Sequence, residues 1–297
     1  MPAPAPIDLG NAPGAVPLER DGLIVRGPDA AAFLQGQLSQ DIEALGLGAS
    51  APSFLLQPTG KVDAWLRVTR LDADELLLDV EAGWGDAVLA RLKRFLLRTK
   101  AELEPGRWSG LALRGPGVGA AADAVDLGPG VRRLAAGWPG EGVDLLGPGG
   151  SAVATGVPAA TAESLHALRV ESGVPSMGSE IDGSTIPAEL GQWVIDASVS
   201  FTKGCYTGQE LVARIDSRGG NVPRPVRGLL LDGLASPGDT VSFDGVDVGR
   251  ATSTAVSPAV GPVALAVLAR SVTVGSAITV AAAGGSVTGR VSELPLR

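Results

Sequence analysis

Apolar positions in the first half of the chain fall into short runs that end at Gly-Pro turns. The run Leu23–Val25 predicts a strand, and after the turn at 27–28 the apolar residues at 30, 33, 34 and 38 follow helical spacing. The same order returns at 111–117, where an apolar run, an Arg-Gly-Pro turn and an alanine-rich stretch predict strand, turn and helix. We interpret the two units as an internal repeat that packs on a shared antiparallel sheet.

Between and after these units, the hydrophobic pattern predicts further strands and helices. Alternating residues on both sides of the turn at 58–60 favour a hairpin, and short apolar runs elsewhere favour more strands. The expected strands cover 53–57, 62–69, 75–80 and 143–146. Helices are expected over 84–97 and over 161–171, the second capped by Thr161.

Beyond Pro223 and Pro225 the pattern changes to short valine-rich segments separated by Gly, Ser and Asp. These segments cover 227–231, 240–243, 246–251, 263–268, 277–281 and 286–291. Six even strands with few helices are typical of a small β-barrel or sandwich. The expected fold is α+β, with a flexible tail over 1–17, a mixed region of two interleaved lobes over 18–222 and a C-terminal β domain over 223–297.

Composition and charge narrow the range of partners. The chain has 297 residues, 19% of them charged, and a formal net charge of −8. A nucleic-acid partner is not expected, because phosphate binding requires a basic surface. Basic residues do cluster on and after one predicted helix, where a solvated helix face is the simpler interpretation. They are Arg91, Lys93, Arg94, Arg98 and Lys100.

The sequence contains one cysteine and one histidine, too few for a four-ligand protein metal site, so no resident metal is expected. His166 lies on the predicted helix over 161–171, where a surface or packing role is more common than metal binding. Residues 1–6 have neither a basic segment nor an apolar core, so they predict no secretory signal and no membrane span. With its single thiol, the protein is expected in the cytoplasm, a reducing compartment.

The candidate chemistry is concentrated in residues 201–210, which hold the only cysteine and the only tyrosine of the chain. A cysteine reacts as its thiolate, and Lys203, two residues before Cys205, would favour that form. Gly204 and Gly208 permit positive φ and a close approach of the backbone to a ligand. The alternative is an inert, buried cysteine in a glycine-rich turn, and the residue types alone do not choose between the two.

The octapeptide Lys-Gly-Cys-Tyr-Thr-Gly-Gln-Glu at 203–210, followed by Leu-Val-Ala-Arg, resembles the signature of the folate-binding YgfZ family. That family is related to the aminomethyltransferase T-protein of the glycine cleavage system and acts in the synthesis or repair of iron–sulfur clusters. The stretches at 168–173, 180–182 and 186–191 also resemble T-protein segments. The resemblance implies a T-protein-like folate-binding fold with a small C-terminal β-barrel.

The resemblance also implies roles for individual residues. Glu171 matches a T-protein glutamate that contacts the pterin of tetrahydrofolate, although a solvated carboxylate at a helix end is an equal alternative. Asp63 matches one member of an acidic pair whose other member is here Ala64, which argues against ordinary aminomethyltransferase activity. The expected catalytic residues are Cys205, Lys203 and Asp63. The expected cofactor-binding residues are Glu171, Tyr206, Gly204, Gly208, Gln209, Glu210 and Arg214.

These observations support the hypothesis of a cytoplasmic protein that binds tetrahydrofolate or a one-carbon derivative and supports iron–sulfur cluster assembly or repair. Its partners would be iron–sulfur client or assembly proteins, and Cys205 would be its essential thiol. The folate is expected in a central cleft, with the pterin near Glu171 and the loop over 203–210 at the entrance. The alternatives are a folate-dependent one-carbon transferase with Asp63 as its acid, and a scaffold that binds no folate.

Overall fold

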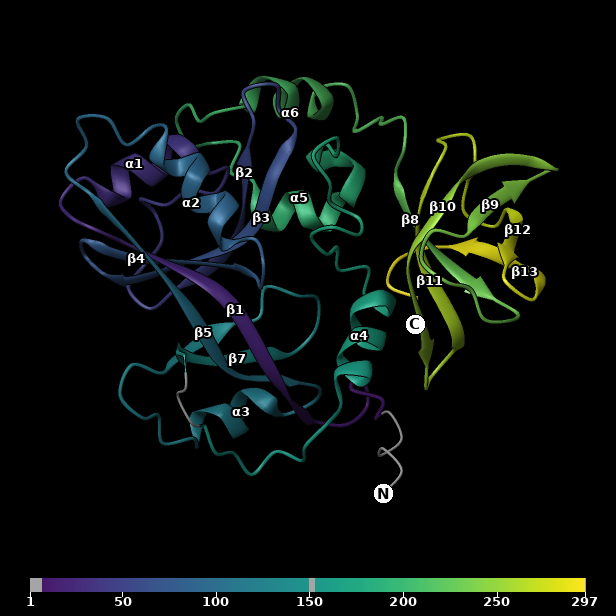
Figure 1. The fold of residues 1–297 in the computed structure, drawn as a ribbon, viewed down its shortest axis with the longest axis horizontal. Coiled ribbons are helices and arrows are strands. Elements are labelled where there is room, and N and C mark those ends of the chain that lie inside the picture. Colours follow the sequence, from purple (N-terminus) through teal and green to yellow (C-terminus); the bar gives the residue numbers. More distant parts are fainter. Residues whose placement is uncertain (1–6, 150–152, 297) are drawn as a thin grey trace.

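The computed structural model of the chain describes residues 7–149 and 153–296. Its first part is built on one antiparallel sheet with the strand order β2-β3-β4-β1-β5-β7-β6 (Figure 1). The central strand β1 pairs with β4 on one side and with β5 on the other. The strands are β1 (Gly14–Arg26), β2 (Ser50–Leu56), β3 (Val62–Asp72), β4 (Glu75–Glu81), β5 (Glu102–Arg114), β6 (Arg132–Ala135) and β7 (Gly142–Pro148).

Short helices connect these strands and lead toward the second part of the molecule. They are α1 (Ala30–Gln37), α2 (Gly85–Lys93), α3 (Val118–Asp123), α4 (Ala162–Glu171), α5 (Gln192–Ser198) and α6 (Gln209–Asp216), with a 3-10 turn η1 (Pro187–Leu190). The largest core cluster joins Leu34 of α1 and Leu92 of α2 to Phe54 and Leu78 of the sheet, all at most 2% exposed. As expected, Thr161 caps α4 by accepting a hydrogen bond from Ser164 N.

The internal repeat is confirmed as two strand-turn-helix units, β1 with α1 and β5 with α3, on neighbouring antiparallel strands. Gly27 and Gly115 occupy the same place in the two turns, with φ of 134° and 105°. A Cβ at Gly27 would lie 2.4 Å from Lys100 O, and one at Gly115 would lie 2.3 Å from Ala12 O. Both turns therefore need glycine, for its conformation and for the close backbone approach.

The flexible tail expected over residues 1–17 is wrong from residue 7 onward. β1 already begins at Gly14, and Leu9, Ala15 and Val16 are at most 5% exposed. Proline and glycine in this stretch suggested disorder, but its apolar residues are buried against Ala112 of β5 and neighbouring side chains. Residues 1–6 lie outside the described part of the chain.

Two further expectations need correction, although the hairpin of β2 and β3 and the strand β4 are confirmed. The helix expected over 84–97 ends at Lys93, because Phe95 N and Leu96 N close three-residue turns and Arg98 adopts a positive φ of 62°. The edge strand β6 was not predicted, since it has four residues and begins with two arginines.

The six C-terminal strands are confirmed, and they form a closed barrel in the order β10-β11-β8-β13-β12-β9. Leu229, Val241, Ala264 and Val280 fill its interior with no exposed surface. α4 lies between the sheet and the barrel and packs on β10 and β11 (Figure 1). The strands are β8 (Val226–Leu231), β9 (Thr240–Phe243), β10 (Val246–Ser257), β11 (Gly261–Leu268), β12 (Ala277–Ala282) and β13 (Gly285–Ser292).

Candidate functional site

The loop that carries the single cysteine is anchored to the C-terminal end of α1 by Lys203. The Lys203 Nζ donates hydrogen bonds of 2.6, 2.7 and 2.8 Å to the carbonyl oxygens of Gln35, Leu38 and Gln40. It also lies 5.1 Å from the centre of the Tyr206 ring. The last carbonyls of a helix lack partners within the helix and attract cations. Lys203 is therefore a structural anchor, with its ammonium group directed at backbone oxygens.

Burial affects both ionisable side chains that anchor this loop. It lowers the pKa of Lys203 to about 8 and raises the pKa of Tyr206 to about 12. Tyr206 is 9% exposed, and its backbone N–H donates to Gln209 Oε1 at 3.1 Å. Thr207 N donates to Gly36 O of α1, also at 3.1 Å. Side-chain and backbone contacts thus fix the residues on both sides of Cys205.

Glycine at 208 is required by the contact between this loop and the β2–β3 hairpin. Gly208 has a φ of 83°, and a Cβ there would lie 2.5 Å from Gln57 O. Gly60 in the hairpin has a φ of 81°, and its Cβ would lie 2.5 Å from Leu211 Cβ. Gly204 differs from both, since it lacks a positive φ and its Cβ would meet no heavy atom within 4 Å. The expected positive φ is thus confirmed for Gly208, where the backbone approaches the hairpin, and is wrong for Gly204.

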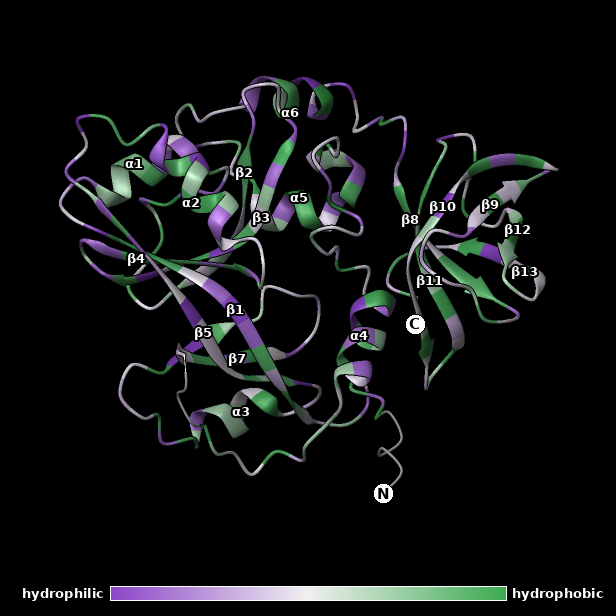
Figure 2. Cartoon of the chain, viewed as in Figure 1, coloured by the Kyte–Doolittle hydropathy of each residue, from purple (hydrophilic) through white to green (hydrophobic). Residues whose placement is uncertain are grey.

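Cys205 is exposed, so the alternative of a buried, inert cysteine is wrong. The following helix α6 carries hydrophilic and hydrophobic residues side by side (Figure 2), and Val212 is its buried residue. Glu210 in its first turn and Arg214 in its last turn are both exposed. The thiol and the charged side chains of α6 therefore face solvent.

The structure pairs Asp63 with Arg91 and buries Glu171 at the end of α4. Asp63 Oδ2 accepts a hydrogen bond from Arg91 Nε at 3.0 Å, and the two side chains form an ion pair. Glu171 ends α4 with no exposed surface, and its carbonyl accepts a hydrogen bond from Leu296 N at 2.7 Å. Neither residue lines the large cavity described next.

A cavity of about 360 Å³ lies between the sheet and α4. Its wall is formed by β1, β3, the residues around Trp138, α4 and the segment 174–176. Trp65 and Trp138 are its two tryptophans, and Glu81 adds a carboxylate. The sequence reasoning missed these residues. The sequence signal for them was the presence of charged residues within otherwise apolar strands. This pattern indicates a buried ionic network, but it does not indicate which residues lie beside the network.

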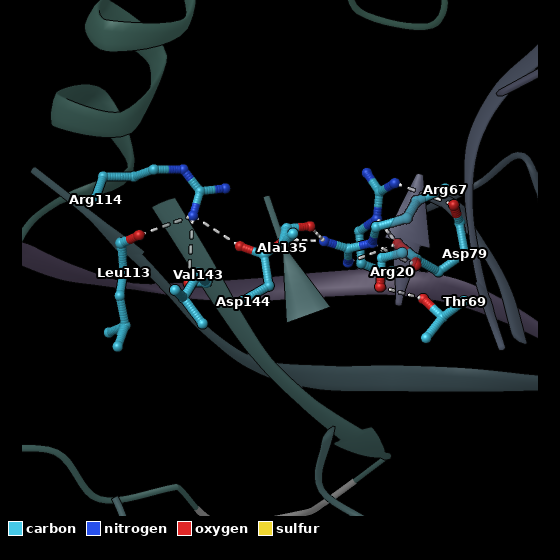
Figure 3. Close-up of polar contacts among 10 residues, drawn as sticks. Arg20, Arg67, Thr69, Asp79, Leu113, Arg114, Ala135, Val143 and Asp144 are labelled. Carbon is cyan, nitrogen blue, oxygen red and sulfur yellow. Dashed lines mark hydrogen bonds and ion pairs between the residues drawn. The ribbon is translucent and has the colours of Figure 1, made fainter. Parts of the chain in front are cut away.

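A buried network of three arginines and two aspartates lies beside the cavity (Figure 3). Four of its members line the cavity, namely Arg20, Arg67, Arg114 and Asp144. Arg67 Nε and Nη2 donate to the two oxygens of Asp79 at 2.8 and 3.0 Å, and its Nη1 donates to Asp144 Oδ2 at 2.7 Å. Arg20 Nε donates to Asp79 Oδ1 at 2.8 Å, and Arg114 Nη1 donates to Asp144 Oδ1 at 2.8 Å. The arginines come from β1, β3 and β5, so the network joins strands across the sheet.

Burial alone would raise the pKa of Asp144, but the adjacent Arg114 and Arg67 lower it to about 2. Burial likewise opposes the charge of Arg67, yet Asp79 and Asp144 raise the pKa of this guanidinium above its usual range. Arg67 and Asp144 are therefore ionised at neutral pH. Arg114 also stacks on Trp138, with its guanidinium carbon 4.6 Å from the ring centre.

The opposite side of the cavity is attached to the barrel through α4. Arg169 donates to Glu180 Oε2 at 3.1 Å and to Ser253 Oγ of β10 at 2.6 Å. His166 Nε2 lies 3.0 Å from Thr254 O, also in β10. Burial lowers the pKa of His166, and the positive charge of Arg169 adds to this effect. His166 and Arg169 line the cavity, so its shape depends on how the barrel is seated.

The cysteine loop and the cavity are separate. No residue from 201 to 210 lines the cavity, although the whole loop belongs to the described residues. The loop touches the hairpin at Gly60, whereas the cavity begins near Trp65. Five residues of extended strand span roughly 16 Å. The loop is therefore not the entrance of this cavity.

The C-terminal residues 224–296 match the family model of the glycine cleavage T-protein C-terminal barrel domain. The tRNA-modifying protein YgfZ of Edwardsiella ictaluri is 30% identical over 220 residues, covering 66% of this chain and 65% of that protein. The mitochondrial iron-sulfur cluster assembly factor IBA57 homolog of Neurospora crassa is 28% identical over 216 residues, which cover 66% of this chain and 48% of that protein. The chain belongs to the YgfZ family. It spans about two thirds of the length of the curated relatives that it matches.

The fold of this YgfZ-family chain is that of the T-proteins. The crystal structure of the glycine cleavage system aminomethyltransferase T from Bartonella henselae superposes with a TM-score of 0.78. The superposition covers 98% of this chain and 88% of that one, at 22% identity. In the described part of the chain, no helix is long and apolar enough to cross a bilayer. The same residues contain no group of three or more His, Cys, Asp or Glu side chains that could hold a metal ion.

Proposed function

We propose that this YgfZ-family chain binds tetrahydrofolate in the cavity beside α4 and supports assembly or repair of iron–sulfur clusters in other proteins through Cys205. The observation that carries the proposal is the exposed thiol on an anchored loop outside the cavity. A thiol in this position can reach a cluster or persulfide on a partner protein, because it is exposed among the described residues. Two relatives are named as an iron-sulfur cluster assembly factor and as an aminomethyltransferase. These names agree with a proposal that combines cluster support by the thiol with folate binding in the cavity.

The cavity residues fit a folate. Trp65 and Trp138 offer aromatic surfaces for the pterin and benzoyl rings. Glu81 accepts hydrogen bonds from Ser176 Oγ at 2.6 Å and Met177 N at 3.1 Å, one on each carboxylate oxygen. Each oxygen keeps a second acceptor site, so Glu81 can also accept from the amino-pyrimidine edge of a pterin. Glu81 therefore takes the role that the sequence suggested for Glu171. The bound folate would supply a reduced ring able to carry a one-carbon unit.

The transferase alternative is weakened by the position of its expected acid. Asp63 is held by Arg91 in an ion pair and does not line the cavity. The next residue, Ala64, is 1% exposed and packs into the core. No carboxylate from this pair would therefore face a folate at Trp65, and general acid–base assistance requires contact or one bridging water.

The proposal is tested in cells that lack their own YgfZ-family protein. The activity of an iron–sulfur enzyme, normalised to its protein level, is measured after expression of the wild type, Cys205→Ala and Asp63→Asn. We expect loss of support for Cys205→Ala at unchanged protein abundance, and near-normal support for Asp63→Asn. Full support by Cys205→Ala would overturn the role of the thiol. Loss with Asp63→Asn alone would favour the transferase.

A further inference from the structure

We propose that residues 93–100, which contain the last residue of α2 and the turn after it, form a docking surface for a partner protein with an acidic surface and an apolar pocket. We call these residues the basic segment. That the partner is an iron–sulfur client or assembly protein rests on the proposed function, whereas its charge and its pocket follow from the segment itself. The segment combines four cations with two exposed apolar side chains: Lys93, Arg94, Arg98 and Lys100 with Phe95 and Leu97.

The four cations of the basic segment are exposed, and none of them forms an ion pair with another described residue. Two carboxylates are near them in the structure or the sequence. Asp29 Oδ2 accepts a hydrogen bond from Lys100 N at 2.7 Å, and Glu102 follows as an exposed residue. The patch therefore stays positive on a chain whose formal charge is −8. Such a patch attracts an acidic surface and orients it during encounter.

Two large apolar side chains lie among these cations. Leu97 is 84% exposed and Phe95 is 42% exposed. Leu96, between them, packs against the main core cluster, and its carbonyl accepts a hydrogen bond from Thr99 N at 3.2 Å. An ordered turn thus holds Leu97 away from the core. An exposed apolar side chain on a fixed backbone favours a partner that offers an apolar pocket, because little backbone freedom is lost on binding.

The basic segment and the cysteine loop lie at the two ends of α1. At the N-terminal end, Asp29 and Lys100 are joined by the hydrogen bond from Lys100 N and by a second one from Asp29 N to Lys100 O at 3.3 Å. At the C-terminal end, Lys203 Nζ and Thr207 N donate to carbonyl oxygens of α1 and the residues after it. α1 has eight residues. Such a helix is about 12 Å long, so the segment and the loop that carries Cys205 are close neighbours on the surface.

The outer face of α1 leaves the surface between them open. Ala32 is exposed, and a Cβ added at Gly36, four residues further on, would meet open space. Phe201, 49% exposed, adds apolar surface at the start of the cysteine loop. A standard interface buries roughly 800 Å² of each partner, a patch about 30 Å across. One partner can therefore cover the basic segment and still meet the thiol.

A nucleic acid and a membrane fit this surface less well than a protein. A polynucleotide would be repelled by the net negative charge of the chain and would leave Leu97 without a contact. An anionic membrane would accept the cations and Leu97, but it would cover the neighbouring thiol with lipid. An acidic protein surface satisfies the cations, the apolar side chains and the thiol together.

The first test measures the activity of an iron–sulfur enzyme in cells that lack their own YgfZ-family protein. It compares the wild type, Cys205→Ala and two variants of the basic segment, Lys93→Glu/Arg98→Glu and Leu97→Ser. Matched controls change side chains that are likewise exposed but lie in the barrel domain: Arg270→Glu/Arg290→Glu and Leu234→Ser. Thermal unfolding verifies that each variant is folded. We expect loss of support in both variants of the segment and none in the controls.

The second test identifies the partner. The photoreactive residue p-benzoylphenylalanine takes the place of Leu97, or of Leu234 as the control, and is activated in growing cells. Mass spectrometry then identifies the cross-linked molecules. We expect cross-links from position 97 to acidic iron–sulfur proteins. Their yield should fall roughly tenfold when Lys93→Glu/Arg98→Glu is added, because two attractive charges become repulsive.

The outcomes separate the docking surface from the proposed function. Normal support by both segment variants, with loss in Cys205→Ala, would overturn the surface and leave the function intact. Full support by Cys205→Ala would overturn the function, while charge-dependent cross-links to acidic proteins would still support the surface. Absence of cross-links, yields that ignore the charge reversal, or cross-links to RNA alone would refute the surface. Binding of the purified wild type to phosphatidylglycerol vesicles, lost in Lys93→Glu/Arg98→Glu, would refute it in favour of a membrane.

Discussion

Replacement of Lys203 by methionine tests whether the ammonium group, and not general packing, holds the cysteine loop. Methionine keeps much of the apolar length but loses the three hydrogen bonds to Gln35, Leu38 and Gln40. Hydrogen bonds from charged groups contribute about 1.5–3 kcal/mol each to stability when they are buried. Because Lys203 is only half-buried, we assign about 1 kcal/mol to each of its hydrogen bonds. We therefore expect Lys203→Met to lower the free energy of unfolding by about 3 kcal/mol.

Urea unfolding at pH 7 measures this loss, and Lys61→Met provides the matched control. Lys61 is exposed in the neighbouring hairpin, so its replacement should change stability by less than about 0.5 kcal/mol. The same Lys203 variant should lose support of iron–sulfur enzymes while it keeps its affinity for folate, because the cavity lies elsewhere. A stability change as small as that of the control would refute the anchoring role of Lys203.

Two further predictions concern the glycine contact and the buried network. Gly208→Ala should destabilise the protein by at least about 1 kcal/mol, because its φ is 83° and the added Cβ would lie 2.5 Å from Gln57 O. Gly204→Ala is its control, and an equal effect of both in urea unfolding would contradict the steric argument. The adjacent arginines lower the pKa of Asp144 to about 2 in the folded protein, from 3.8 for a free aspartate, so its stabilising contribution is present above pH 4 and lost as the pH falls toward 2. Linkage makes this about 2 kcal/mol, and urea midpoints between pH 4 and 2 should fall less steeply in Asp144→Asn than in the wild type. Parallel slopes would argue against the ion pairs of Asp144 with Arg114 and Arg67.

The repeated units and the barrel strands could be predicted because their signals are local. Gly27 and Gly115 mark equivalent turns, and period-two alternation marks the strands beyond Pro225. The closure of the barrel and the strand order of the sheet depend on pairings between distant segments, such as β1 with β5, which no local pattern specifies. The prediction of a flexible N-terminal tail was wrong for the same reason, since Leu9 is buried by residues far along the chain.

The candidate site could be predicted only in part. The octapeptide drew attention to Cys205 and Gly208, and the structure places both in one anchored loop. Lys203 was expected to act on the thiol, but a sequence does not show that the carbonyls at the end of α1 are within its reach. The cavity was missed because Trp65 and Trp138 are 73 positions apart in the sequence and line the same cavity only after folding.

The central claim is that folate and thiol act at separate places. An anaerobic calorimetric titration with tetrahydrofolate tests it most directly, with the wild type, Cys205→Ala, Glu81→Gln and Glu171→Gln. We predict saturable binding to the wild type, unchanged by Cys205→Ala and weakened by Glu81→Gln more than by Glu171→Gln. Absence of binding to the wild type, or loss of binding in Cys205→Ala with Glu81→Gln unaffected, would contradict the account.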